Sequence, residues 1–101
     1  MIKVAVFCAA GMSTSMLVNK IRTSAKSKGV DIDINAYPES EMSKHTDVNC
    51  VLLGPQIKFL QGQAKKIFDP HKVPVEVINT MDYGMMKGEN VLNTILKITN
   101  K

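Results

Sequence analysis

The chain has 101 residues, enough for one domain with a real core and too few for two. With 45% hydrophobic and 22% charged residues, it has the composition of a globular protein, which argues against disorder. No apolar run is long enough to cross a bilayer and no secretion signal is visible, so a cytoplasmic location is predicted. The net charge of +4 is spread along the chain without clustered arginines or interleaved aromatic residues, which argues against nucleic-acid binding.

The first predicted elements are a strand and a helix joined by very small residues. The apolar run 2–7 predicts a buried strand, and apolar residues at every fourth position predict a helix over 13–28. Between them, Ala9, Ala10 and Gly11 carry almost no side chain, so the backbone can fold tightly around a small ligand and Gly11 can adopt a positive φ. The apolar positions of the helix are Leu17, Ile21 and Ala25.

Residues 8–15 combine an anion site with a nucleophile. A helix N-terminus offers unpaired N–H groups and the positive end of the dipole, which hold a phosphate-sized anion without lysine or arginine. The hydroxyls of Ser13, Thr14 and Ser15 add donors and can cap the helix. Cys8 lies at the rim, where the same field stabilises a thiolate and makes it nucleophilic near neutral pH. The alternative is a small buried cysteine at a strand end, but the loop favours the nucleophile.

Three further strands and two further helices follow in alternation. The run 48–53 is apolar on both faces, as in a central strand. In 30–37 apolar and polar residues alternate, which predicts a strand with one solvent-exposed face. Gly29 is expected to end the first helix. These patterns predict an α/β fold, an open parallel sheet of four strands in the order 2-1-3-4 with helices on both faces. The predicted ranges are 30–37, 48–53 and 75–78 for the strands, and roughly 55–69 and 88–99 for the helices.

In such a sheet, ligands bind at the carboxyl ends of the strands where the winding direction reverses, here between the first and third strands. The turn 53–56 therefore meets the Cys8 loop. Its Gln56 can donate an amide hydrogen bond to a phosphoryl group or a partner, unless the turn only reverses the chain. The loop 79–88 approaches the same edge, where Tyr83 either flanks the site or fills a packing gap.

The remaining candidates carry weaker signals. His45 and His71 are isolated in polar segments and are predicted to be exposed, without a metal site. Cys50 is predicted to be a core residue, and the two cysteines do not form a disulfide framework. Four methionines flank the predicted loops and suit a docking surface, although core packing is the simpler explanation for Met16. These are Met12, Met16, Met85 and Met86.

A cysteine that opens a tight loop before a helix also occurs in low-molecular-weight tyrosine phosphatases, where five residues separate it from an arginine. Here the sixth residue after Cys8 is Thr14, so the arginine that clamps the transferring group during water attack is missing. Asp82 is the only aspartate in a plausible loop and is more simply a turn residue than an acid. A phosphocysteine at Cys8 is therefore expected to wait for a second acceptor, as in a carrier.

Four blocks, in order, carry a resemblance to a known family. They are 6–18, 36–39, 51–57, and 74–78 with Tyr83 and Gly84 after it. The chain resembles the B component (EIIB) of the phosphoenolpyruvate-dependent sugar phosphotransferase system (PTS), of the lactose and cellobiose (diacetylchitobiose) type. The resemblance covers essentially the whole chain, 1–101, as one domain.

The resemblance implies that Cys8 accepts a phosphoryl group from a phosphohistidine of the cognate A component. The group then passes to a disaccharide bound by the membrane C component, so the chain would work in the cytoplasm and transiently at the inner face of the membrane. The family needs no metal or organic cofactor. The resemblance also assigns phosphate binding to the loop, with Ala9 replacing the serine of many relatives and removing one auxiliary hydroxyl. The loop residues are Ala9, Ala10, Gly11, Met12, Ser13, Thr14 and Ser15.

Two functions from other classes stay open. A phosphatase or an arsenate reductase would use the same thiolate, and a regulatory domain that senses phosphate would tolerate the same loop. Phosphorylation of Cys8 by a phosphohistidine donor separates the carrier from these alternatives. The sequence does not identify the sugar.

Overall fold

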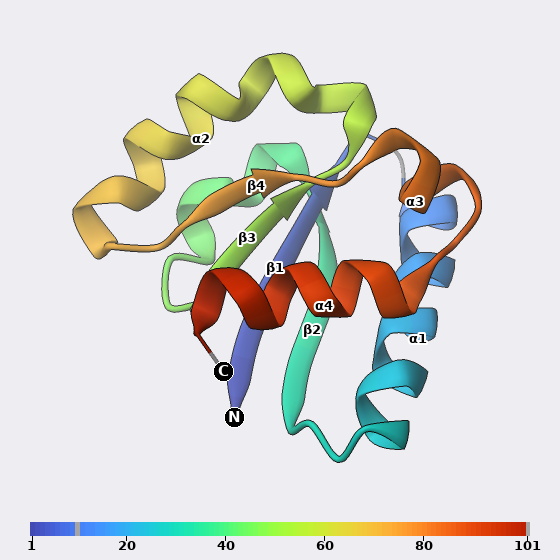
Figure 1. Cartoon of the computed structure of the whole chain (residues 1–101). Coiled ribbons are helices and arrows are strands. Elements are labelled where there is room, and N and C mark those ends of the chain that lie inside the picture. Colours follow the sequence, from blue (N-terminus) through green and yellow to red (C-terminus); the bar gives the residue numbers. More distant parts are fainter. Residues whose placement is uncertain (10, 101) are drawn as a thin grey trace.

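The computed structural model describes residues 1–9 and 11–100, without the side chains of residues 11–13. Within these residues the chain forms an open parallel sheet of four strands in the order β2-β1-β3-β4 (Figure 1). The predicted topology is therefore confirmed. The strands are β1 (Ile2–Cys8), β2 (Ile32–Pro38), β3 (Cys50–Leu53) and β4 (Val75–Val77).

Helices cover both faces of the sheet, because alternate residues of the strands point to opposite sides. Val4 and Val6 of β1 pack with α1 and α4, whereas Ala5 and Phe7 pack with α2 and its neighbours. The α-helices are α1 (Gly11–Ser27), α2 (Gln61–Phe68), α3 (Thr80–Gly84) and α4 (Gly88–Thr99). Short 3-10 helices are η1 (Glu39–Lys44), η2 (Pro55–Leu60) and η3 (Asp69–His71). None of the helices in the described part is long and apolar enough to span a membrane.

The helix α1 ends as the sequence predicts. Gly29 has a φ of +70°, and the N–H of Val30 donates to the carbonyl of Ala25 at 2.8 Å. This left-handed residue and the backbone bond across it close the helix C-terminus. They also delay the second strand, which was predicted from residue 30 and begins at Ile32.

Two helix predictions need correction. The first helix was predicted from residue 13 but begins at Gly11, so the loop after β1 is shorter than expected and Gly11 belongs to the helix. The helix predicted over 55–69 divides into η2, α2 and η3. Within η2 the backbone also leaves the helical region at Ile57, which is buried in the core and has φ −117° and ψ 26°.

The loop predicted over 79–88 contains a short helix, α3. Asn79 caps it, because the side-chain oxygen accepts hydrogen bonds from the N–H groups of Met81 at 2.9 Å and Asp82 at 3.2 Å. Such a cap compensates for the missing intrahelical acceptors of the first turn. The next helix, α4, covers 88–99 as predicted.

Candidate functional site

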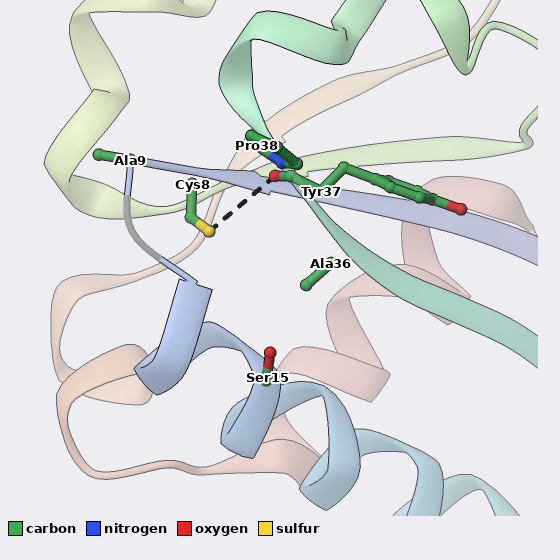
Figure 2. A pocket seen from close by; sticks show the side chains of 6 residues that line it. All are labelled: Cys8, Ala9, Ser15, Ala36, Tyr37 and Pro38. Carbon is green, nitrogen blue, oxygen red and sulfur yellow. Dashed lines mark hydrogen bonds between the residues drawn. The ribbon is translucent and has the colours of Figure 1, made fainter.

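Cys8 is the last residue of β1 and lies at the carboxyl edge of a central strand. Its side chain is only 2% exposed, and Sγ lies 4.0 Å from the backbone oxygen of Tyr37 on the neighbouring strand (Figure 2). Helix α1 begins three residues later at Gly11, and Ala10 lies outside the described residues. Figure 2 shows this helix beginning beside Cys8. The unpaired N–H groups of a helix N-terminus therefore lie close to the sulfur.

A small pocket of about 120 Å³ opens in front of Cys8. Figure 2 shows the hydroxyl of Ser15 directed from α1 toward the space between the helix and β2. The first turn of α1 contains no acidic residue, so no carboxylate there repels an anion. The described residues that line the pocket are Cys8, Ala9, Ser15, Ala36, Tyr37 and Pro38.

The turn after β3 lies next to Cys8, as the winding of the sheet predicted. The N–H of Gly54 donates to the carbonyl of Phe7 at 2.9 Å. A Cβ atom on Gly54 would lie 3.7 Å from Cβ of Cys8 and 2.7 Å from Oε1 of Gln56. The Gln56 side chain therefore folds back over Gly54, close to Cys8. Whether its amide binds a phosphoryl group stays a prediction.

Thr14 and Tyr83, two of the predicted site residues, contact one another. The Thr14 side chain is fully buried, and its Oγ1 lies 2.8 Å from the hydroxyl of Tyr83, which is 8% exposed. Of the two alternatives for Tyr83, the structure favours the packing residue, since its ring belongs to the core cluster of α1 and α4. The Thr14 hydroxyl is turned into the core, so only its backbone N–H stays a predicted phosphate donor.

Tyr37 is a pocket residue that the sequence reasoning did not single out. Its ring stacks on His45, with ring centroids 3.7 Å apart and an interplanar angle of 16°. Nε2 of His45 lies 3.2 Å from Oε1 of Glu41, and the His45 side chain is only 25% exposed. The prediction of an exposed His45 is therefore wrong, because η1 folds this residue back onto the end of β2. His71 is exposed, as predicted.

A polar groove of about 510 Å³ continues from the pocket between α1 and β2. Its cation is Arg22, the only arginine of the sequence. The guanidinium donates to the carbonyl of Ile34 and to the side-chain oxygens of Asn35 at 3.0 Å and Asn19 at 3.0 Å. These bonds tie α1 to the edge strand β2, so Arg22 serves the fold and is not the phosphate clamp of a phosphatase.

Cys50 differs from Cys8 in its surroundings. It lies within β3, is fully buried, and belongs to the core between the sheet and α1 and α4, as predicted. Burial, with a smaller contribution from the negative charge of Glu76, raises the pKa of the Cys50 thiol to about 12. This cysteine is therefore a protonated core residue at neutral pH.

Known proteins are similar to this chain in sequence and in fold. Residues 3–94 match the family described as PTS system, Lactose/Cellobiose specific IIB subunit. The galactose-specific EIIB component of Lactococcus lactis subsp. cremoris is 39% identical over 105 residues, which span 96% of this chain and 95% of that protein. The oligo-beta-mannoside-specific EIIB component of Bacillus subtilis is 35% identical over 97 residues, which span 95% of this chain and 94% of that protein.

Two solved structures extend the comparison to three dimensions. The cellobiose-specific IIB component of Borrelia burgdorferi superposes with a TM-score of 0.80 at 42% identity, over 98% of this chain and 92% of that one. The lactose-specific IIB domain of Streptococcus pneumoniae has a TM-score of 0.84 at 19% identity, over 95% of each chain, and shares the fold. The cysteine-ended strand, the α/β sheet and these matches agree, and the chain belongs to the lactose/cellobiose-specific IIB subunits of the PTS, which are phosphotransferases.

Proposed function

We propose that Cys8 carries a phosphoryl group from the A component of a lactose/cellobiose-type PTS to a disaccharide bound by the membrane C component. The observation that carries the proposal is the position of Cys8. Its sulfur lies at the end of β1, beside the N-terminus of α1 and in a pocket of small-anion size. A helix N-terminus stabilises both a thiolate and the phosphate attached to it.

The transfer comprises two displacements at one phosphorus atom. In the first, the thiolate of Cys8 attacks the phosphohistidine, the P–N bond breaks, and the imidazole leaves with the bonding electron pair. In the second, a sugar hydroxyl oxygen attacks, the P–S bond breaks, and the thiolate is regenerated. The hydroxyl proton passes to a base outside the pocket. Both steps need the attacking and leaving atoms in line, so the protein acts mainly by positioning and by electrostatic stabilisation.

The phosphate would be held without cationic side chains. The expected donors are the backbone N–H groups of residues 9–15, the hydroxyls of Ser13 and Ser15, and in addition the Gln56 amide. The described residues that line the pocket include no carboxylate, imidazole or guanidinium. Without a base or a clamp, attack by water is slow, and the phosphocysteine persists until a sugar replaces water. This chemistry favours a carrier over a phosphatase.

Partner proteins would dock around the same edge. Met81 and Met85 of the α3 segment are 66% and 62% exposed, and Met16 on α1 is also exposed. The bond between Thr14 and Tyr83 places α3 against the first turn of α1, beside the Cys8 loop. Flexible methionine side chains adapt to more than one partner, and a carrier must bind both a donor and an acceptor.

The test is the intact mass of the chain after incubation with phosphoenolpyruvate, the general PTS proteins and a lactose/cellobiose-type A component. A single phosphoryl adduct is expected on the wild type and on Cys50→Ala, and none on Cys8→Ser. An adduct on Cys8→Ser, or no adduct on the wild type with a donor shown to be active, would contradict the proposal. Membranes that contain the C component, supplied in turn with cellobiose, lactose and galactose, then identify the sugar.

A further inference from the structure

We propose that Tyr83 is a positioning residue for phosphoryl transfer, because its hydroxyl fixes the first turn of α1 through Thr14. The inference rests on the proposed function and deepens it. Tyr83 does not line the pocket. It acts on the reacting phosphorus only indirectly, through its bond to Thr14 and the backbone of the first turn of α1.

The bond joins segments that are 69 positions apart in the sequence. Thr14 is the fourth residue of α1 and is the only polar residue among the fully or nearly fully buried side chains described. In this apolar setting its hydroxyl has Tyr83 as its partner at 2.8 Å. A buried hydroxyl without a hydrogen-bond partner is unfavourable, because it has lost its hydration and gained no bond in return. The pair therefore strongly favours the arrangement of α1 and α3 in which the two hydroxyls meet.

The Tyr83 hydroxyl is itself held in place by its segment. Asn79 caps α3, and the N–H of Lys87 donates to the carbonyl of Asp82 at 2.8 Å. The side chain of Asn90 on α4 also donates to Asp82 Oδ1 at 3.1 Å. Residues 79–90 therefore form a braced unit that presents the Tyr83 hydroxyl to α1 at a defined position.

The position of the first turn of α1 matters because its backbone N–H groups are the expected donors to the phosphate. The first four N–H groups of a helix have no intrahelical acceptor, and they are the expected ligands of the phosphate on Cys8. A helix end frays more readily than its middle, and α1 has no carboxylate in its first turn to stabilise it. Electrostatic catalysis requires donors that are already in place when charge develops. The Thr14–Tyr83 bond supplies that restraint from the core side.

The matched experiment removes the hydroxyls singly. Tyr83→Phe keeps the ring, Thr14→Val keeps the shape of Thr14, and Thr14→Ser keeps its hydroxyl. The single-turnover rate of Cys8 phosphorylation by the A component is measured against donor concentration. Tyr83→Phe and Thr14→Val are each expected to lower the maximal rate about tenfold, with the half-saturating donor concentration changed by less than about twofold, and Thr14→Ser to retain most of the rate.

A stability control separates positioning from packing. Ile95→Val shortens a buried side chain of α4 away from the pocket and is expected to lower Tm by roughly 5 °C, a change similar to that of Tyr83→Phe. Its phosphorylation rate should equal that of the wild type. Equal losses of rate in Ile95→Val and Tyr83→Phe, or an unchanged rate in Tyr83→Phe, would overturn the proposal.

A second measurement needs no donor protein. Inorganic phosphate should protect Cys8 of the wild type and of Thr14→Ser from alkylation by iodoacetamide, and protect Tyr83→Phe and Thr14→Val several-fold less well. If the wild type accepts no phosphoryl group, the carrier function fails while this test of Tyr83 stands. Equal protection of all four proteins, or protection of none, would contradict the positioning role.

Discussion

At the residue scale, the two cysteines have different surroundings because of where each lies in its strand. Cys8 ends β1, so one side of its thiol meets a helix N-terminus and a pocket. Cys50 begins β3, is flanked by β1, and is covered by the core of α1 and α4. The core environment of Cys50 disfavours a charged sulfur.

The burial of Cys50 predicts a pH dependence of stability. The pKa of Cys50 is raised from 9.0 to about 12 in the folded protein. Below pH 9 the thiol is protonated in both states, so its titration does not change the free energy of unfolding. Between these values the unfolded chain loses the Cys50 proton while the folded chain keeps it. Stability should therefore fall as the pH rises, by up to about 1.4 kcal/mol per pH unit from this group.

Urea unfolding of the wild type and Cys50→Ala over this pH range isolates the effect, because the other titrating groups are common to both proteins. The stability advantage of the wild type should shrink as the pH rises above 9. Parallel stability curves for the two proteins would contradict the prediction.

At the element scale, the contact between α4 and α1 depends on a residue without a side chain. A Cβ on Gly88 would lie 2.6 Å from the backbone carbon of Lys20 and 2.8 Å from the nitrogen of Ile21. These are backbone atoms of α1, which cannot turn aside as a flexible side chain can. Gly88 is thus required for close approach of the helices, and its φ is not in the left-handed region.

Gly88→Ala is expected to destabilise the fold by about 1–3 kcal/mol, since α4 must move away from α1. Gly62→Ala is the matched control, because a Cβ on this residue of α2 has no atom within 4 Å. The control should stabilise by about 0.5 kcal/mol through helix propensity alone. Urea unfolding measures both changes, and a neutral Gly88→Ala would mean that the helices adjust at no cost.

At the scale of the whole molecule, the carboxyl edge of the sheet brings together the proposed phosphoryl carrier, Cys8, and the surface proposed for its partners. The Cys8 loop, the Gly54 turn and α3 come from three distant segments and meet there. Figure 1 shows α3 next to the N-terminal end of α1. The proposed apolar docking surface, defined as Met16, Met81 and Met85, lies on α1, on α3 and at the C-terminal cap of α3.

The double variant Met81→Glu/Met85→Glu should weaken docking by adding two charges to this surface. We expect phosphorylation by the A component to fall at least about tenfold in kcat/KM, with an unchanged Tm. Lys66→Glu near the end of α2 changes the net charge by the same amount and should leave kcat/KM near the wild-type value. If both proteins lose activity equally, net charge rather than the methionine surface governs docking.

The local features of this protein could be predicted from its sequence. Continuous and alternating apolar runs identified the strands and their order, and the small residues after Cys8 marked the loop, because these signals act between near neighbours in the chain. The helix 88–99 was predicted with its observed ends for the same reason. The role of Cys8 in phosphoryl transfer stays a prediction from that loop and from the family.

Which of the predicted residues contact one another depends on how the elements pack, and the sequence pattern did not predict it. The bond between Thr14 and Tyr83 and the stack of His45 on Tyr37 depend on how separate elements pack. The non-helical backbone of Ile57 within η2 likewise had no signal in the apolar pattern of that segment. Propensity and pattern report the preferences of one segment, whereas these contacts reflect the free energy of packing several segments together, which no single segment encodes.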